Sequence, residues 1–334
     1  MDWQRIIADS LQQGLGPDAA VFALAAIGLN MHFGYTGLLN FGQAGFMAVG
    51  AYTMASFVAT WGLSLWLGLA TALLVAVVLA LLLGVPTLRL RADYLAIVTI
   101  AAAEIIRQTV GSVTLLEWFG GQDGIQTFNQ SFKDLNPFDS PKGIPGVVEW
   151  RPYDFWVVVV GWTLVAIAVV LVWLLVRSPW GRVLKGIRED EDAVRSLGKN
   201  VYAFKMQSLV IGGLFGALAG VLLALQKQAF NPSLFATDTT FFAYTVLLLG
   251  GAARVLGPVV GSIIFWFLIN FLDGFFGQAT DPADGGPLIP AWIMDPNQAS
   301  LVRFIVMGLA LMLLMIFRPQ GIFGDRRELA IDAR

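Results

Sequence analysis

Long apolar runs separated by short polar stretches are the main pattern of this 334-residue chain. Several runs approach or exceed the roughly 20 residues that an α-helix needs to cross a bilayer. The alternation over ~10-residue segments that marks a transmembrane β-barrel is not seen in the sequence. The pattern therefore predicts an all-α, polytopic integral membrane helical bundle, built as a single transmembrane domain over residues 1–334.

The apolar runs give about nine candidate spans, within a range of about eight to ten. They cover residues 19–29, 37–60, 64–84, 94–111, 155–176, 204–225, 241–251, 255–272 and 301–317. The range depends mainly on the glycine-rich stretch at 34–52, which either crosses as one helix or is interrupted.

The stretch 34–52 carries glycines and the polar residues Asn40 and Gln43 within a sequence of membrane-like hydropathy. Glycine weakens a helix, and each polar group at membrane depth needs a partner. We expect a broken or re-entrant helix, of the kind that lines solute paths in transporters. Asn40, Gln43, Gly42 and Gly45 are the candidate pathway residues. The alternative is that both amides bond across helices and serve only structure.

Glu104 and Arg107 lie one helical turn apart in another apolar run. Isolated charges in a membrane are costly, and pairing at i, i+3 relieves that cost. Structural pairing is the favoured interpretation, and Glu104 is kept as a further candidate for the substrate pathway. His32, the single histidine, is interpreted as a hydrogen-bonded core residue.

Residues 177–205 hold seven Lys/Arg and four Asp/Glu between two apolar runs, so they must face water. The excess of Lys and Arg predicts the cytoplasmic side. Within this segment, 182–197 is predicted to be one amphipathic helix, with a left-handed cap at Gly198. Its apolar face would contain Val183, Leu184, Ile187, Val194 and Leu197.

The other charges extend this topology. Lys and Arg residues place three further regions inside, namely Arg89 with Arg91, Arg254, and the tail 318–334 with Arg318, Arg326, Arg327 and Arg334. The acidic loops 112–154 and 273–300, the second with Asp273, Asp281, Asp284 and Asp295, are predicted outside. Nine spans would place the N-terminus outside, and a broken 34–52 segment changes that parity.

Small residues repeat at four-residue spacing in two later runs, at Gly212, Gly216, Gly220 and at Gly257, Gly261. Glycines on one helical face let two backbones approach closely in lipid. We interpret all five as helix-packing positions within one subunit, with a subunit interface as the alternative.

Several function classes are excluded. The net charge of −2 gives no indication of nucleic acid as a partner. The absence of cysteine rules out disulfides and thiolate metal sites, and one histidine is too few for a histidine-based metal site. Neither a catalytic constellation nor a cofactor or metal site is expected. A phosphate-binding loop is missing from the sequence, so ATP hydrolysis would have to take place on another polypeptide.

Six sequence blocks resemble the permease subunits of branched-chain amino acid ABC transporters. They are GYTGLLNFGQAGFMAVGAY (34–52), RLRADYLAIVTIAAAEIIRQ (89–108), GGQDGI (120–125), GRVLKGIREDEDAVRSLGKNVYAFK (181–205), LLGGAARVLGPVVGSII (248–264) and FRPQGIFG (317–324). They occur in the family's order and extend over almost the whole chain. Gln43 departs from the pattern, because many relatives have histidine there.

The resemblance implies a multi-pass permease in the inner membrane of a prokaryote, working by alternating access and without enzymatic activity of its own. It also implies four kinds of partner besides the lipid bilayer: a second related permease, two cytosolic ATP-binding subunits, an extracytoplasmic solute-binding protein, and a small polar solute. The solute would be a branched-chain or related amino acid, with urea, short amides, sugars or nucleosides as alternatives. An ATPase-independent secondary transporter or channel is the competing hypothesis, and Glu104 is the candidate that it would need.

The same resemblance makes 177–205 the segment that couples to the ATPase. Asp192 to Gly198 occupies the position of a Glu-Ala-Ala…Gly pattern, with Asp192 for Glu and Val194 for the second Ala. The residues predicted to take part in coupling are Gly181, Arg182, Lys185, Arg188, Glu191, Asp192, Ala193 and Gly198.

Overall fold

The computed structural model describes residues 2–89, 92–144, 148–280, 289, 295–318 and 320–324. Several charges used above to predict the topology lie outside the described residues, namely Arg91, Asp281, Asp284, Arg326, Arg327 and Arg334.

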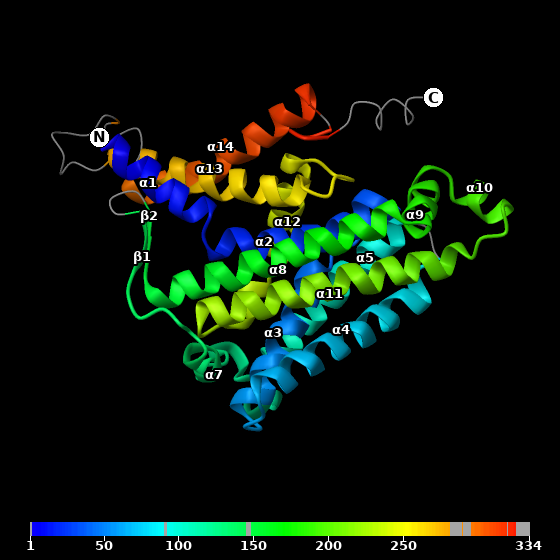
Figure 1. Ribbon diagram of the computed structural model, residues 1–334, viewed down its shortest axis with the longest axis horizontal. Coiled ribbons are helices and arrows are strands. Elements are labelled where there is room, and N and C mark those ends of the chain that lie inside the picture. The colour runs from blue at the N-terminus through cyan, green and yellow to red at the C-terminus, as the bar shows by residue number, and fades with distance from the viewer. Residues whose placement is uncertain are drawn as a thin grey trace.

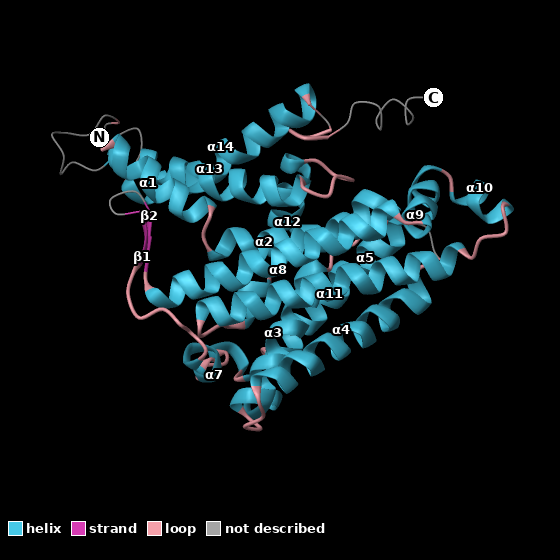
Figure 2. Cartoon of the chain, viewed as in Figure 1, coloured by secondary structure: helices cyan, strands magenta, loops and turns pink. Residues whose placement is uncertain are grey.

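The described chain is almost entirely helical, with one short two-stranded hairpin (Figure 2). The α-helices are α1 (Trp3–Gly14), α2 (Pro17–Leu29), α3 (Gln43–Ala59), α4 (Leu65–Thr87), α5 (Ala92–Val110), α6 (Leu116–Phe119), α7 (Gln130–Asp134), α8 (Pro152–Arg177), α9 (Pro179–Glu189), α10 (Glu191–Ser196), α11 (Val201–Lys227), α12 (Thr237–Gly250), α13 (Gly257–Thr280) and α14 (Pro296–Phe317). Each predicted apolar run overlaps one of these helices, which confirms the all-α membrane class.

Helix length bears on the number of spans. Among the described residues, four helices are long and apolar enough to cross a membrane, or six if each of two bent pairs forms one span. This count is lower than the about eight to ten predicted. The difference arises because apolar runs include helices that end early: α3 has 17 residues and α12 has 14.

α2 lies at the centre of the bundle, and its residues 19–29 are all buried. Helices α8, α11, α12 and α13 pack around it (Figure 1). α3 packs between α11, α4 and α5. Residues 19–29 of α2 are all apolar and carry no side chain that needs water, so this part of the helix can be enclosed on every side. The chain is therefore layered around one buried helix.

The outer helices α4 and α14 expose apolar side chains. These include Trp66, Leu74, Val78 and Leu82 on α4, and Leu301, Ile305, Leu309 and Ile316 on α14. Apolar faces of this extent are unfavourable in water and favourable in hydrocarbon. These two surfaces are therefore suited to contact lipid.

The two ends of the bundle differ (Figure 1). Arg89 stacks on Tyr202 at the start of α11, and Arg177, Arg254 and Phe323 line one surface hollow, so these predicted inside charges lie near the 177–205 segment. The 112–154 loop lies at the opposite end. This segregation agrees with the predicted opposition of the two regions, and which end is cytoplasmic stays a prediction.

The N-terminal helix α1 lies at the end of the bundle away from the 177–205 segment (Figure 1). α1 packs on α13 at the end that carries the 112–154 loop, where Gln12 Nε2 donates to Glu149 O at 2.5 Å and Asp2 N donates to Gln278 Oε1 at 2.8 Å. This placement puts the N-terminus on the side opposite 177–205, where nine spans would place it. Ile6, Ser10 and Gly14 are the buried positions of α1, which packs against α13.

The 112–154 loop is folded onto the bundle. It contains α6, α7 and the antiparallel strands β1 (Lys142–Ile144) and β2 (Val148–Trp150), with Gly143 opposite Glu149. Phe128 packs edge-on against Phe230, and Phe230 packs edge-on against Tyr52 of α3. Aromatic packing of this kind holds the loop in place as an ordered surface.

Close packing of α11 on α3 provides a test of the fold. A side chain at Gly220 would meet the backbone of Met47, so we expect Gly220→Val to lower the free energy of unfolding by about 3 kcal/mol. Gly308, on the exposed side of α14, has nothing within 4 Å of a built Cβ, and Gly308→Val should change stability by less than about 1 kcal/mol. Denaturant unfolding in detergent measures both values, and equal effects would contradict the assigned packing.

Candidate functional site

The glycine-rich segment is broken, as predicted. α2 continues into a π-helical turn, Asn30–Tyr35, and residues 37–42 are not helical before α3 begins at Gln43. Gly37 has φ +72°, a conformation that favours glycine. Asn30, the first residue of the turn, joins it to the loop after α12. Its Nδ2 donates to Arg254 O and its Oδ1 accepts from Ala253 N, both at 2.8 Å. Short π-helical turns inside α-helices are frequent at functional sites.

A fully buried polar cluster lies directly beside the break. Asn40 Nδ2 lies 3.0 Å from His32 Nδ1 and donates to Gln43 Oε1 at 3.4 Å. Gln43 Nε2 donates to Ala25 O at 3.2 Å and to Gly212 O at 3.4 Å. Because Asn40 and Gln43 are closed to water in this conformation, their contacts here are cross-helix bonds, and their part in a solute path stays a prediction.

Hydroxyl side chains form hydrogen bonds with backbone N–H and C=O groups that the break leaves without helical partners. Thr99 Oγ1 of α5 accepts from Phe41 N at 3.1 Å, and Thr240 Oγ1 of α12 accepts from Ala44 N at 2.9 Å. Tyr244 OH donates to Asn40 O at 2.9 Å. The sequence analysis missed these three residues. The sequence offers only a weak signal for them, a hydroxyl within an apolar run or at its start, and Thr99 and Thr240 are fully buried.

The five packing glycines all lie at contacts within this chain. A built Cβ on Gly216 would lie 2.7 Å from Gln43 Nε2, and one on Gly212 would lie 2.5 Å from Gly28 O. Gly220 faces Met47, and Gly257 and Gly261 face the end of α12 and the loop that follows it. α11 can therefore approach the polar cluster closely enough for Gly212 O to accept a hydrogen bond from Gln43.

α5 carries its charged pair on the side away from the break. Gly42 and Gly45 face Thr99 and Ala103 on one side of the helix. On its other side, Arg107 Nη2 lies 2.6 Å from Glu104 Oε1, and the side chains are 24% and 41% exposed. Gln108 Nε2 also donates to Glu104 Oε1 at 2.8 Å. The large exposed side chains of α4 are apolar, whereas α5 presents a charged pair. The face of α5 that carries Glu104 and Arg107 is therefore poorly suited to contact lipid.

The charged segment forms two helices, and the prediction of one helix over 182–197 is wrong. Asp190 separates α9 from α10 with extended backbone, φ −155° and ψ 101°. Its carboxylate accepts from Ala193 N at 2.9 Å and so caps α10. The chain breaks here because an aspartate can replace the lost helical bonds from its side chain. Gly198 has φ +75°, which confirms the predicted left-handed cap.

The burial of the amphipathic face partly matches the prediction. Leu184, Ile187 and Val194 are buried, whereas Leu197 is 79% exposed at the tip beyond α10. The break at Asp190 turns α10 away from the bundle, so the last predicted apolar position has no surface of this chain to cover.

The predicted coupling residues divide into two sets. Those exposed to solvent are Arg182, Lys185, Asp192, Ala193 and Gly198. Gly181 and Glu191 are more buried: Gly181 packs on Val176, and Glu191 pairs with Lys205 and Arg195. Arg188 is exposed as well, but its Nη1 donates to Gly34 O at 2.7 Å.

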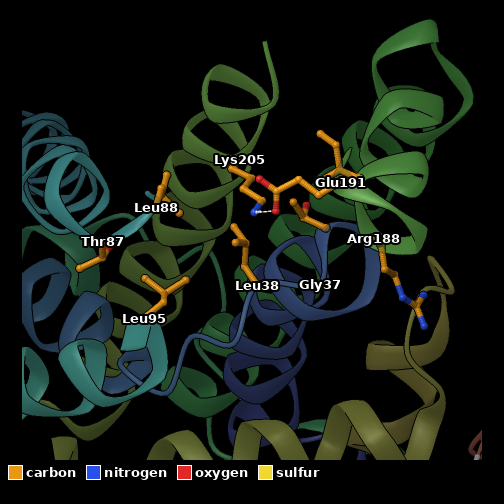
Figure 3. A pocket seen from close by; sticks show the side chains of 10 residues that line it. Gly37, Leu38, Thr87, Leu88, Leu95, Arg188, Glu191 and Lys205 are labelled. Carbon is orange, nitrogen blue, oxygen red and sulfur yellow. Dashed lines mark hydrogen bonds and ion pairs between the residues drawn. The ribbon is translucent and has the colours of Figure 1, made fainter. Parts of the chain in front are cut away.

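A cavity of about 290 Å³ lies between the charged 177–205 segment, the break at 37–42 and the start of α5. Gly37, Leu38, Leu95, Arg188, Glu191 and Lys205 are among its lining residues (Figure 3). Figure 3 shows the Glu191–Lys205 ion pair across the cavity, and the Arg188 guanidinium turned away from it. The charged segment, the broken segment and α5 therefore meet in one place.

The model of the family described as "Branched-chain amino acid transport system / permease component" matches residues 17–314. The chain belongs to this family. The permease is 30% identical over 314 residues to a protein of Salmonella typhimurium, with 90% of this chain and 67% of that protein covered. That relative is called the high-affinity branched-chain amino acid transport system permease protein LivM.

Two further relatives cover most of both chains. A probable branched-chain amino acid transport permease protein LivM of Methanocaldococcus jannaschii is 27% identical, with 92% of the permease and 91% of that protein aligned. A guanosine ABC transporter permease protein, NupQ of Bacillus subtilis, is also 27% identical, with 88% of each chain aligned. No solved structure matches the permease. The permease is thus a multi-pass membrane component of an ABC transporter.

Loss of the buried amide at position 40 should destabilise the permease. Asn40→Leu removes the acceptor of Gly42 N and the partner of His32, and we expect the free energy of unfolding to fall by about 3 kcal/mol. Thr163→Leu is the matched control, because Thr163 is exposed on α8 and bonds only Val159 O of its own helix. Its effect should stay below about 1 kcal/mol. Equal unfolding midpoints for the two variants would show that the Asn40 bonds contribute nothing.

Proposed function

We propose that this permease moves a branched-chain or related amino acid across the inner membrane of a prokaryote by alternating access. ATP hydrolysis on two cytosolic ATP-binding subunits drives the cycle, and an extracytoplasmic binding protein delivers the solute. The observation that carries the proposal is the contact between the charged 177–205 segment and the broken glycine-rich helix, in a chain of the branched-chain amino acid permease family.

The ATP-binding subunits dock on the knob formed by α10 and the residues that follow it. This knob projects from the end of the bundle (Figure 1). Asp192, Ala193 and Leu197 are exposed on it, and Val194 fastens it to α9 by packing against Gly186. An apolar tip within a ring of charged groups is suited to a groove on a soluble partner. Energy from ATP enters the permease here, because a bound solute shifts the states only by its differential affinity.

The second permease lies opposite the outer face of α5, with the solute path between the two subunits. A charged pair at membrane depth that is 24% and 41% exposed is costly beside lipid, and a neighbouring protein or a water-filled path removes that cost. Glu104 and Arg107 then lie along the solute path, on the helix that also packs on Gly42 and Gly45. The buried amides of Asn40 and Gln43 reach this path only if the break opens.

The extracytoplasmic binding protein docks on the folded 112–154 loop. This loop presents an ordered surface at the end opposite the knob, with exposed Trp118 and Leu135. Its aromatic packing onto α3 connects that surface to the helix that follows the break.

The amino acid assignment follows from the LivM relatives, and the guanosine permease relative supports a second candidate class, nucleosides. Urea and short amides are further alternatives. An ATPase-independent carrier or channel competes with the whole proposal, and it would depend on Glu104 for ion coupling.

Transport should depend on ATP and on the partner subunits. In proteoliposomes with the assembled complex and its binding protein, we expect leucine, isoleucine or valine to stimulate ATP hydrolysis more than guanosine or urea. The assay measures phosphate release over this panel. Uptake that continues after deletion of the ATP-binding subunits would refute the coupled mechanism, and stimulation by guanosine alone would replace the amino acid by a nucleoside.

Thiol labelling should separate the faces of the permease, because the native chain has no cysteine. Gln108→Cys, on the outer face of α5, should react with a small charged thiol reagent in the assembled complex. Leu74→Cys, at an exposed position on the apolar face of α4, should stay unlabelled in the membrane. Asn40→Cys should react only while the complex hydrolyses ATP.

Mass spectrometry of the intact chain measures the labelling of each variant. Labelling of Leu74→Cys and Gln108→Cys to the same extent would remove the distinction between the lipid face and the path. An Asn40→Cys variant that never reacts would assign the buried amides to structure alone.

A further inference from the structure

The broken helix ends against the charged segment, and one side chain joins them. Arg188 of α9 donates from Nη1 to Gly34 O at 2.7 Å, across 154 positions of sequence. Gly34 lies in the π-helical turn, three residues before the left-handed Gly37. A Cβ built on Gly37 would lie 3.4 Å from Arg188 Cγ, so the two backbones approach closely over the same stretch.

The electrostatics of this contact are favourable. The final carbonyls of a helix lack helical donors and carry partial negative charge, so a cation at that end is stabilised. The bond is charge-assisted, which makes it stronger than a bond between neutral groups. Arg188 also stays accessible to water, so its charge needs no buried counterion.

The end of the π-helical turn is also held by other elements. Asn30 bonds the backbone at residues 253 and 254, and Thr36 Oγ1 lies 2.7 Å from Ser208 Oγ of α11. These contacts join the turn to parts of the transmembrane bundle, whereas Arg188 joins it to the water-facing segment. A displacement of α9 therefore acts on residues 34–37 directly, only a few positions before Asn40.

We propose that Arg188 is a positioning residue that transmits movement of the charged segment to the broken helix, without touching solute. This inference rests on the proposed function, because it assigns the route by which ATP-driven movement reaches the break. The exposed knob around α10 binds the ATP-binding subunits, and Arg188 carries the displacement inward. Covalent attachment through α8 and α11 alone is the competing route.

Substitutions at position 188 separate the two routes. In proteoliposomes with the assembled complex, Arg188→Met should lower the leucine transported per ATP hydrolysed by about tenfold, the weight of one charge-assisted hydrogen bond. Arg188→Lys keeps a cationic donor and should fall between wild type and Arg188→Met. Arg177→Met is the matched control, because Arg177 lies near the same end of the bundle but stacks on Trp173.

A reversible crosslink tests the same contact without its hydrogen bond. A Cβ on Gly37 would lie 3.8 Å from Arg188 Cβ, which is close to the separation in disulfides. The double variant Gly37→Cys with Arg188→Cys should therefore crosslink on mild oxidation, in a chain that is otherwise free of cysteine. In its reduced form, the double variant should transport little leucine per ATP hydrolysed. In its oxidised form, it should regain this coupling, because the disulfide again joins the two segments.

The outcomes decide between the alternatives. Full coupling in Arg188→Met, or Arg188→Lys no better than Arg188→Met, would overturn the inference. The inference would also be overturned if the oxidised double variant remains uncoupled while Gly37→Cys alone transports normally. If Gly37→Cys alone is impaired by its positive φ, the comparison of Met with Lys at position 188 decides. Wild-type transport without ATP would instead refute the proposed function itself.

Discussion

The rest of this structure depends on one constraint: backbone polar groups inside a membrane must be paired within the protein. Residues 37–42 violate helical pairing in the middle of the bundle, and the surrounding elements supply the partners. Thr99 and Thr240 accept from the break's N–H groups, and Tyr244 donates to Asn40 O. The break can exist because two other helices, α5 and α12, are close enough to supply these bonds.

That requirement explains the placement of the glycines. α11 comes near the break through Gly212, Gly216 and Gly220, where a side chain would strike Gly28, Gln43 or Met47. Gly42 and Gly45 let α5 approach from the other side. Close approach and polar pairing are thus one arrangement, since the buried Gln43 amide donates to backbone carbonyls of two neighbouring helices, Ala25 O of α2 and Gly212 O of α11.

The same arrangement relates the two charged regions to the break. Arg188 reaches the last turn before it, and Glu104 with Arg107 lies on the far side of the helix that covers it. A segment that faces water and a pair that lipid cannot cover are therefore both attached to the least regular part of the fold. In the proposed mechanism, this arrangement would connect the segment that couples to the ATP-binding subunits directly with the solute path.

Hydropathy by itself determined the helical membrane class, the positions of the apolar helices and the interruption at 34–52, because these depend on local residue type and length. The spacing of residues along the sequence also predicted the Glu104–Arg107 pair and the cap at Gly198. Only the tertiary structure decided that Asp190 splits the charged helix, that α1 joins the opposite end, and that Arg188 turns to Gly34. These depend on partners distant in sequence, which no local pattern specifies.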